Sequence, residues 1–301
     1  MNLTQNAAKH SFEDTFVAWL TTFVLSLPNG LRVVRHSPEV VNVESSDGFR
    51  VLTITLKSLN QRQISDSKTS ANQLVNKSII IHEDLWFTKP FIIQSRLKAL
   101  LGISERIPAR LTKVRRVDKA DTLRFLEENH LQGPLPARYA YGLYLPQHYE
   151  RVLHSPQLFT NQLRTQDGML VALATFAPPR IFTRETGPHR SFEMIRFANL
   201  AHTTVVGGLT KLLSHVVKEH QPNDIMTYVD LEWSVGQSFE KQGFKAVNDT
   251  DKHLFWVQPE NLKRYPTQRL PEGLTELNAE AQGYLKVYTA GSRKFVLTIH
   301  P

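Results

Sequence analysis

The chain of 301 residues contains no cysteine. This absence excludes disulfide bonds, thiolate zinc sites and cysteine nucleophiles, and it fits a reducing compartment. No run of about 18 apolar residues occurs, which argues against a membrane span. The early apolar stretch Phe16–Leu27 follows Glu13 and Asp14 rather than a basic segment. We therefore interpret it as a buried helix and not as a signal peptide.

The net charge of +8 is concentrated in one stretch of the chain. Residues 89 to 124 hold ten lysines and arginines against three acidic residues, Glu105, Asp118 and Asp121, which gives ten minus three, or +7. A basic stretch of this kind attracts phosphate backbones and releases condensed counterions. The alternative is a solvated face of a basic protein. The twelve histidines form no metal-binding pattern, and we expect no metal site.

The length predicts two domains. In the first, residues 1–108, the apolar patterns predict helices at 11–27 and 90–101, strands at 31–35, 40–43, 49–56 and 78–82, and a short helix at 70–75. In the second, residues 109–258, they predict strands at 109–117, 139–145, 169–176, 191–199, 225–229 and 254–257, and helices at 119–129, 210–219 and 234–242. Residues 259–301 are expected to form a linker and a terminal hairpin made of 284–289 and 294–299. The fold class is α/β (α+β).

The segment Phe192–Phe244 has the order strand, glycine-bearing turn, helix, strand, helix. The predicted turn is Thr203–Gly208, and the helix start that follows it presents free N–H groups, which bind phosphate groups. Gly207 and Gly208 allow close approach of a ligand, and Thr203 and Thr204 add hydroxyl donors. Tight helix packing explains the two glycines equally well.

The run Ser238–Phe244, which ends in Gly243-Phe244, resembles the closing motif of the GNAT acyltransferase family. The resemblance covers about residues 110–258. It implies a mixed sheet flanked by helices, with acetyl-CoA or another acyl-CoA as cofactor. It also implies that the helix carrying Phe239 lies against coenzyme A, and that the strand before this helix splays from its neighbour to admit the pantetheine arm. Thr203–Gly208 departs from the family's pyrophosphate loop, because it lacks a leading Gln or Arg and its glycines are adjacent.

Four patches are similar to phage GNAT-like domains, namely those of Mom-type DNA-modification proteins and of homing-endonuclease-like proteins. They are Phe125–Gly133, Glu193–Asn199, Tyr228–Gly236 and Tyr284–Val296. This resemblance implies a group transferase that acts on nucleic acid, with DNA favoured over RNA. It also implies a cytoplasmic location, which would be the host cytoplasm for a phage protein.

Asp66–Trp86 resembles the later part of a Vsr-like endonuclease domain, of the restriction-endonuclease-like α/β class. That domain needs acidic metal ligands on its central strand. The corresponding strand here, Leu52–Lys57, carries no carboxylate. We therefore interpret the first domain as a degenerate nuclease fold kept for binding or as a scaffold. Asp66, Glu83 and Asp84 are the remaining carboxylates that could ligate a metal.

Acyl transfer to an amine requires a base and hydrogen-bond donors. Asp230 and Tyr228 share one face of a predicted strand end and are candidates for base and acid. His130, on the loop after a helix, is a further candidate for a base or a nucleic-acid contact. Each also has a structural alternative, in which Asp230 caps a turn, Tyr228 packs in the core and His130 caps its helix.

Several residues are candidates for nucleic-acid contacts. Arg196 lies in an apolar strand, and its alternative role is an ion pair with Asp230 or Glu193. Trp233 has an indole that could stack on a flipped-out base, and Glu232 lies beside it in the sequence. The basic candidates are Arg110, Lys113, Arg115 and Arg116.

Three hypotheses follow. The first is an acyl-CoA-dependent transferase that acts on nucleic acid. The second is a non-catalytic DNA-binding protein built from degenerate nuclease and acyltransferase folds. The third is an acetyltransferase for a small amine or a protein. The sequence does not fix the acyl group, the target base or the oligomeric state.

Overall fold

The computed structural model describes residues 11–59, 77–184 and 187–299, and the chain folds into two compact units. Unit 1 takes in the chain up to Thr88 together with Leu231–Val235 and Lys252–Gly291. Unit 2 consists of Lys89–Asp230, Gly236–Asp251 and the chain from Ser292 onward. The boundary expected near residue 108 therefore lies earlier, and residues 259–301 are shared between the two units. No helix among the described residues is long and apolar enough to cross a bilayer.

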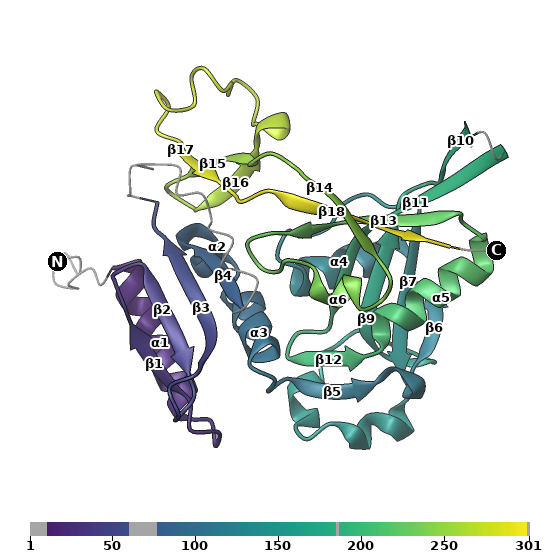
Figure 1. The fold of residues 1–301 in the computed structure, drawn as a ribbon, viewed down its shortest axis with the longest axis horizontal. Helices are drawn as coiled ribbons and strands as arrows, with labels where there is room; N and C mark the ends of the chain where they lie inside the picture. Colours follow the sequence, from purple (N-terminus) through teal and green to yellow (C-terminus); the bar gives the residue numbers. More distant parts are fainter. Residues whose placement is uncertain (1–10, 60–76, 185–186, 300–301) are drawn as a thin grey trace, which may run out of the picture. The chain divides into compact units, whose positions relative to one another are not determined.

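The main sheet of unit 1 has the strand order β1-β2-β3-β4 (Figure 1). The first three strands are antiparallel, and β4 runs parallel to β3. The elements are α1 (Phe12–Leu25), β1 (Arg32–Arg35), β2 (Val40–Glu44), β3 (Arg50–Lys57), β4 (Ser78–His82) and α2 (Glu83–Thr88). The helix expected at 70–75, and Asp66, lie outside the described residues.

Alternation of residue type builds the core of unit 1. Leu52, Ile54 and Leu56 of β3 are fully buried, while the residues between them are only partly covered. The helix α1 begins at Ser11, whose hydroxyl accepts the N–H of Asp14. Phe16 of α1 packs edge-on against Trp86 of α2, with 4.9 Å between the ring centroids. Aromatic pairs in this geometry add to the stability that area burial gives.

A second sheet in unit 1 comes from the late part of the chain. It has the order β16-β15-β17 and is antiparallel throughout, with Trp256 fully buried beneath it. The strands are β15 (Leu254–Gln258), β16 (Lys263–Pro266) and β17 (Leu285–Tyr288). The terminal hairpin expected from 284–289 and 294–299 is therefore wrong, because β17 pairs with β15 and the later strand pairs within unit 2.

Unit 2 contains a large mixed sheet with the order β14-β18-β13-β11-β9-β7-β6. Its strands are β6 (Lys113–Arg116), β7 (Tyr139–Leu145), β9 (Gly168–Phe176), β11 (Gly187–Asn199), β13 (Asp224–Asp230), β14 (Lys245–Asp249) and β18 (Ser292–Thr298), with β8 (Arg164–Thr165) and β10 (Arg180–Arg184) attached at its margins. The pair β11–β13 is parallel, and the other neighbours are antiparallel. A mixed sheet of this kind confirms the expected fold class for unit 2.

Helices flank this sheet. α4 (Lys119–Asn129) packs against β9 and β11, and α5 (Gly208–His220) packs against β7 and β9. The buried residues of α5 are Leu209, Leu212, Leu213 and Val216, which share one helical face. The remaining elements are α3 (Pro90–Leu100), α6 (Gln237–Glu240) and a parallel pair of β5 (Glu105–Pro108) and β12 (Thr203–Val206).

Candidate active site

The parallel strands β11 and β13 pair over only four residues of each. Ser191–Met194 pairs with Asp224–Thr227, after which β11 runs on to Asn199 and β13 to Asp230 without further pairing to each other. The register of β11 against β9 shifts between Met194 and Arg196, which marks a bulge. A bulge bends its strand, so the parallel pair opens at this point. The opening leaves main-chain groups of both strands available to a bound chain.

The amino end of α5 lies at the same end of the sheet as the opening. A crossover helix between parallel strands begins near the carboxyl end of the first strand. Gly207 adopts φ +78° before α5, and no side chain caps the helix. A Cβ on Gly208 would lie 3.0 Å from Val205 and 3.2 Å from Leu143. The first N–H groups of α5 have no partner within the helix and carry a partial positive charge.

The turn predicted at Thr203–Gly208 is mostly a strand. Residues 203–206 form β12, paired with β5, and only Gly207 turns the chain. The Thr203 hydroxyl is buried and donates to the Leu200 carbonyl, and the Thr204 hydroxyl shares a hydrogen bond with Ser104. Both hydroxyls are therefore engaged by the protein itself, and their expected role as ligand donors stays a prediction.

That the helix of Phe239 lies against coenzyme A stays a prediction. Phe239 packs against the core, with its ring centroid 5.4 Å from that of Phe244 and 6.0 Å from that of Phe295. The helix that carries it is a single turn, because Gly236 and Gly243 with positive φ bracket it. A contact that the sequence did not indicate lies close by, since Gln242 accepts the hydroxyl of Thr210 in the first turn of α5 at 3.1 Å.

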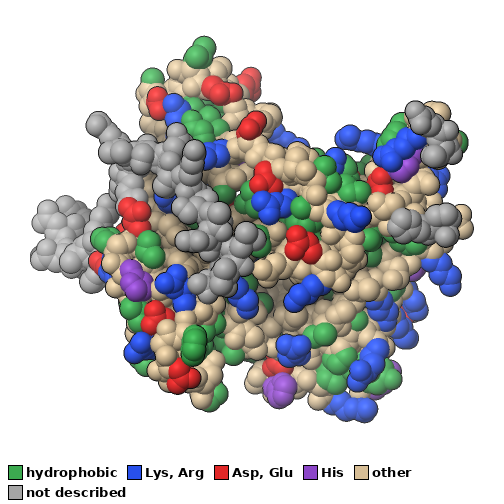
Figure 2. All heavy atoms as spheres, in the orientation of Figure 1, with side chains coloured by type: hydrophobic (Ala, Val, Ile, Leu, Met, Phe, Trp, Pro, Cys, Tyr) green, Lys and Arg blue, Asp and Glu red, His purple; other side chains and the backbone are tan. Residues whose placement is uncertain are grey.

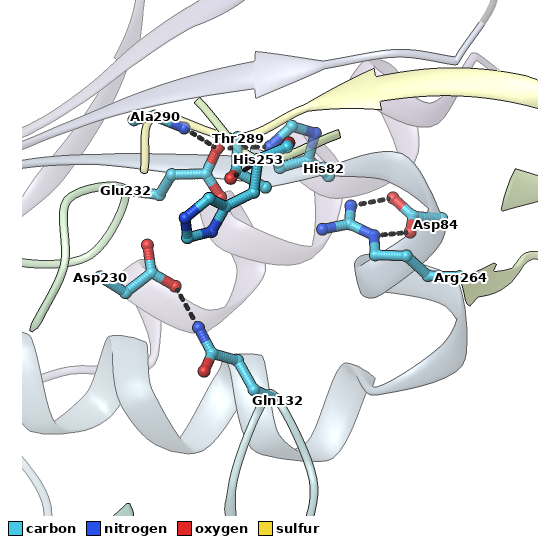
Figure 3. Close-up of polar contacts among 9 residues, drawn as sticks. All are labelled: His82, Asp84, Gln132, Asp230, Glu232, His253, Arg264, Thr289 and Ala290. Atoms are coloured by element: carbon cyan, nitrogen blue, oxygen red, sulfur yellow. Dashed lines mark hydrogen bonds and ion pairs between the residues drawn. The ribbon is translucent and has the colours of Figure 1, made fainter. Parts of the chain in front are cut away.

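Asp230 and His130, both selected from the sequence, are joined by a third residue. The Gln132 side-chain amide donates to Asp230 Oδ2 at 3.1 Å (Figure 3). The backbone N–H of Gln132 donates to His130 Nδ1 at 3.2 Å. Gln132 therefore fixes both candidate groups at the end of β13. In the sequence, Gln132 is marked only by its place in the patch Phe125–Gly133, two residues after His130.

Two partly buried arginines, Arg196 and Arg96, lie close to this cluster in charge interaction with Asp230. Arg196 of β11 donates to the carbonyls of Gly133 and Ile195, at 3.2 and 3.0 Å. Burial lowers the pKa of Arg196 and of Arg96, and the charge of Asp230 acts against this lowering in both. Arg96 belongs to the basic stretch that the sequence placed on the surface. Arg196 therefore contacts carbonyls instead of forming the ion pair considered from the sequence. The negative charges of Glu193 and Asp230 still act on its pKa.

His130 is held neutral. Burial lowers its pKa well below the usual 6.5, and the charges of Arg196, Arg96 and Lys89 act in the same direction. Nδ1 accepts a hydrogen bond, so the proton of the neutral ring is on Nε2. A histidine in this state donates a hydrogen bond more readily than it takes a proton. The geometry therefore favours a donor role over the base expected from the sequence.

Two aromatic candidates differ in accessibility. Tyr228 is 45% exposed and follows the same face of β13 as Asp230. Trp233 lies in unit 1 and is only 5% exposed. An indole with this burial offers no face for a base to stack on, so the stacking expected from the sequence is not supported.

The basic candidates near β6 are dispersed and partly neutralised. Arg115 makes a two-point contact with Asp167, at 2.8 and 3.0 Å, and Lys113 lies 3.7 Å from the same carboxylate. Arg116 lies over the ring of Tyr139, 5.6 Å from its centroid. Arg110 is exposed in a short turn before β6. Alternation along the strand places Lys113 and Arg115 on one face and Arg116 on the other, so they do not form the single stripe expected.

His202 predicts a measurable pH dependence of stability. Burial lowers its pKa to about 4, and its Nδ1 has no hydrogen-bond partner among the described residues. Between pH 6.5 and about 4 the unfolded chain binds a proton that the folded chain does not. The free energy of unfolding therefore decreases as the pH is lowered through this window. Because His202 has φ +65°, asparagine fits its backbone. We expect the free energy of unfolding, measured with urea, to change less across this window in His202→Asn than in wild type. The difference should be about 1 kcal/mol, since solvent screens the partly buried ring. If the free energy of unfolding varies with pH in His202→Asn as it does in wild type, His202 is not the source of the pH dependence.

Two buried ionic contacts within unit 1 connect its early elements to its late segments (Figure 3). His82 Nε2 donates to Glu232 Oε1 at 2.8 Å, and the same oxygen accepts the N–H of Ala290 at 3.2 Å. Arg264 makes a two-point contact with Asp84, with both distances 2.7 Å.

Of the carboxylates considered as metal ligands, the two that the structure describes are therefore engaged. Asp84 pairs with Arg264, and Glu83 accepts the hydroxyl of Ser58 and the N–H of Leu59. Glu232, which the sequence suggested for the acceptor cleft, is 3% exposed and bonded to His82.

No family model matches the chain, and no curated protein matches it. Solved structures with some similarity are acetyltransferases. NAA60 of Arabidopsis thaliana with a bisubstrate analogue is 12% identical, with a TM-score of 0.34, over 63% of this chain and 99% of that chain. A histone acetyltransferase HPA2-related protein of Corynebacterium glutamicum is 11% identical, with a TM-score of 0.34, over 63% and 98%. A Bacillus subtilis acetyltransferase in complex with CoA is 10% identical, with a TM-score of 0.33, over 63% and 99%. These values are too low to transfer an activity, so the proposal below depends on the strand order and contacts of this chain.

Proposed function

We propose that unit 2 is a GNAT-like acyltransferase that uses acetyl-CoA or another acyl-CoA. The observation that carries the proposal is the opening between β11 and β13 after Met194 and Thr227. A parallel pair that separates within a sheet, with a helix amino end beside the opening, provides main-chain partners for an amide-bearing arm and N–H groups for a pyrophosphate.

The residues present fit such a cofactor through their backbone. The N–H groups at the start of α5 would hold the pyrophosphate, and β11 beyond Met194 would hold the pantetheine arm. The engaged hydroxyls of Thr203 and Thr204 remove side-chain donors without affecting these main-chain groups. When bound, the acyl-CoA supplies an activated thioester whose acyl group is transferred.

We assign Asp230 the role of general base. Its carboxylate accepts the proton that an amine acceptor loses as the new nitrogen–carbon bond forms and the carbon–sulfur bond breaks. The exposed hydroxyl of Tyr228 is placed on the same face to donate a proton to the departing sulfur. His130, neutral with its proton on Nε2, is suited to donate a hydrogen bond to the developing oxyanion.

Gln132 provides a test of this arrangement as a positioning residue. We expect Gln132→Ala to lower kcat about tenfold while KM for the acyl donor is unchanged, because both candidate groups lose their tether. The pH–rate profile should also shift, since the carboxylate of Asp230 loses a donor. Gln162→Ala, a change of the same kind on a loop of the same unit, is the control. A kcat equal to that of the control would contradict the role.

We further propose that the acceptor is an amino group of nucleic acid, with DNA favoured, as in the phage Mom-type proteins that the sequence resembles. The net charge of +8 supports an anionic acceptor. Unit 1 would then act as a degenerate nuclease-like scaffold or binding domain, since β3 carries no carboxylate and Asp84 is paired with Arg264. The alternative is a non-catalytic DNA-binding protein, which the engaged threonines and the missing Gln or Arg favour.

Mass spectrometry of nucleosides tests the acceptor. DNA isolated from cells that express the protein is hydrolysed to nucleosides and compared with DNA from cells expressing Asp230→Asn. The proposal predicts a mass adduct of an acyl group in the first sample only. Identical nucleoside profiles would reject nucleic-acid modification and favour the alternative.

A further inference from the structure

We propose that a two-stranded ribbon of unit 2 is an arm that contacts duplex DNA. The ribbon consists of β10 (Arg180–Arg184) and residues 187–191 of β11. This inference rests on the proposal that the acceptor is nucleic acid, and it names the surface that holds this acceptor. The sequence indicated no strand at β10 and placed the basic contacts elsewhere.

The ribbon extends beyond the sheet (Figure 1). β10 pairs only with β11. β11 pairs with β13 from Ser191 onward and with β9 from Met194 onward, so residues before Ser191 have β10 as their single neighbour among the described strands. A free two-stranded hairpin is marginally stable in water. A projecting ribbon of this kind therefore requires contacts at its base.

Three contacts at the base hold the ribbon in place. His189 Nε2 donates to Asp224 Oδ2 at 2.6 Å, and the hydroxyl of Ser191 donates to the other oxygen of the same carboxylate. Arg190 donates to the carbonyl of His220 at the end of α5, at 2.8 Å. These contacts anchor the strands to β13 and α5, so the arm projects in a defined direction.

The side chains beyond this base are exposed. All five residues of β10 are exposed, with Ile181 at 66% and Phe182 at 42%. The side chain of Arg180 makes no hydrogen bond or ion pair with any residue that the structure describes. Arg184 lies over the ring of Phe182, 5.2 Å from its centroid, and 4.0 Å from the carboxylate of Asp224. Figure 2 shows basic and hydrophobic side chains together at this projecting end. Exposed apolar side chains with flanking cations mark a contact surface.

The charge and the shape of the ribbon both favour duplex DNA as its partner. Residues 180–191 contain three arginines and one acidic residue, Glu185, so the net charge is three minus one, or +2. The major groove of B-DNA admits a two-stranded β-ribbon, and arginines on its margins reach phosphates. Alternation along β10 places Phe182 on the same face as Arg180 and Arg184, so Phe182 would contact base edges or sugars in the groove. An acidic peptide would use the cations but gives no reason for the ribbon shape.

Fluorescence anisotropy with a labelled duplex of mixed sequence tests the arm on the full-length protein. We expect Arg180→Glu to weaken binding at least about tenfold and to make the dependence of log K on log salt shallower by about 0.9, the value for one phosphate contact. Lys218→Glu, the same change on an exposed position of α5, is the control and should stay near wild type. Because the side chain of Arg180 is exposed, neither change should affect folding, which circular dichroism checks.

The outcomes separate the arm from the proposed function. If wild type binds the duplex and Arg180→Glu binds equally well, the arm is rejected while the acyltransferase proposal stands. If wild type binds no duplex, both the arm and the nucleic-acid acceptor are rejected. Acetyl-CoA binding, measured on the same preparations, should be equal in wild type and Arg180→Glu, since the ribbon lies outside the opening between β11 and β13.

Discussion

Replacing Asp230 with asparagine is expected to reduce kcat for acyl transfer by about 10²- to 10⁴-fold, the range in which loss of a general base falls. The amide keeps the shape of the side chain and still accepts the hydrogen bond that Gln132 donates at 3.1 Å. It cannot take the proton of an attacking amine. The affinity for acetyl-CoA should remain unchanged, because the cofactor contacts are assigned to the main chain of β11 and α5.

A matched change elsewhere in the same sheet separates this role from a general effect of charge. Asp249 of β14 contacts Arg293 of β18, at 2.6 and 2.8 Å, and both side chains are partly exposed. Asp249→Asn should leave kcat within about twofold of wild type, since exposed ion pairs contribute little. Equal kcat values for Asp230→Asn and wild type would reject Asp230 as the base.

Removal of Asp84 is expected to destabilise unit 1 by about 3–5 kcal/mol, because Asp84→Ala leaves the guanidinium of Arg264 buried without its carboxylate. Asp84 is fully buried, and the Arg264 side chain is 13% exposed. The pair connects α2 to β16, two elements of unit 1 that are far apart in the sequence. Its loss should therefore appear as a lower midpoint in urea unfolding followed by tryptophan fluorescence, since Trp86 and Trp256 belong to this unit.

Two further variants test whether the unpaired buried charge of Arg264 causes this loss of stability. The double variant Asp84→Leu with Arg264→Met should recover most of the lost stability, because replacing both charges with apolar groups removes the unpaired buried charge. Asp14→Ala breaks an exposed pair with Arg35 and should cost about 0–1 kcal/mol. A cost for Asp84→Ala as small as that for Asp14→Ala would contradict the account of unit 1.

The long, strongly patterned elements could be predicted from the sequence. The spans of α4, β4 and β7 agree with the expected residues, because each combines a clear period with a distinct start or stop. Asp118 caps α4, since its carboxylate accepts the N–H of Asp121. The strand that the GNAT resemblance expects to splay from its neighbour is β13, which pairs with β11 only up to Thr227.

Short and non-local features could not be predicted. β10 is exposed along its five residues, and the alternation of β12 extends over only four residues, so Thr203–Gly208 was interpreted as a turn. The return of 252–291 to unit 1 depends on pairs such as Asp84–Arg264, which are 180 residues apart. Sequence patterns carry no signal for such pairs.

The candidate site was predictable in part. Asp230 and His130 do come together, but the residue that connects them, Gln132, has no pattern that sets it apart. Arg96 was assigned to a surface stripe, because arginine is rarely buried. In the structure, burial lowers the pKa of Arg96, and the negative charge of Asp230 opposes this lowering. The protonation state of His130 also depends on neighbours from other elements, so the sequence favoured a base where the surroundings favour a donor.

Titration calorimetry of the full-length protein with acetyl-CoA tests the central claim most directly. The account predicts saturable binding of one acetyl-CoA per chain. It also predicts clearly weaker binding for Gly208→Val, whose side chain would push against Val205 and Leu143 and displace the amino end of α5. Ser214→Ala, an exposed change on the same helix, should bind as wild type does. An absence of heat at high protein concentration, with the protein folded, would contradict the assignment of the opening between β11 and β13 to an acyl-CoA.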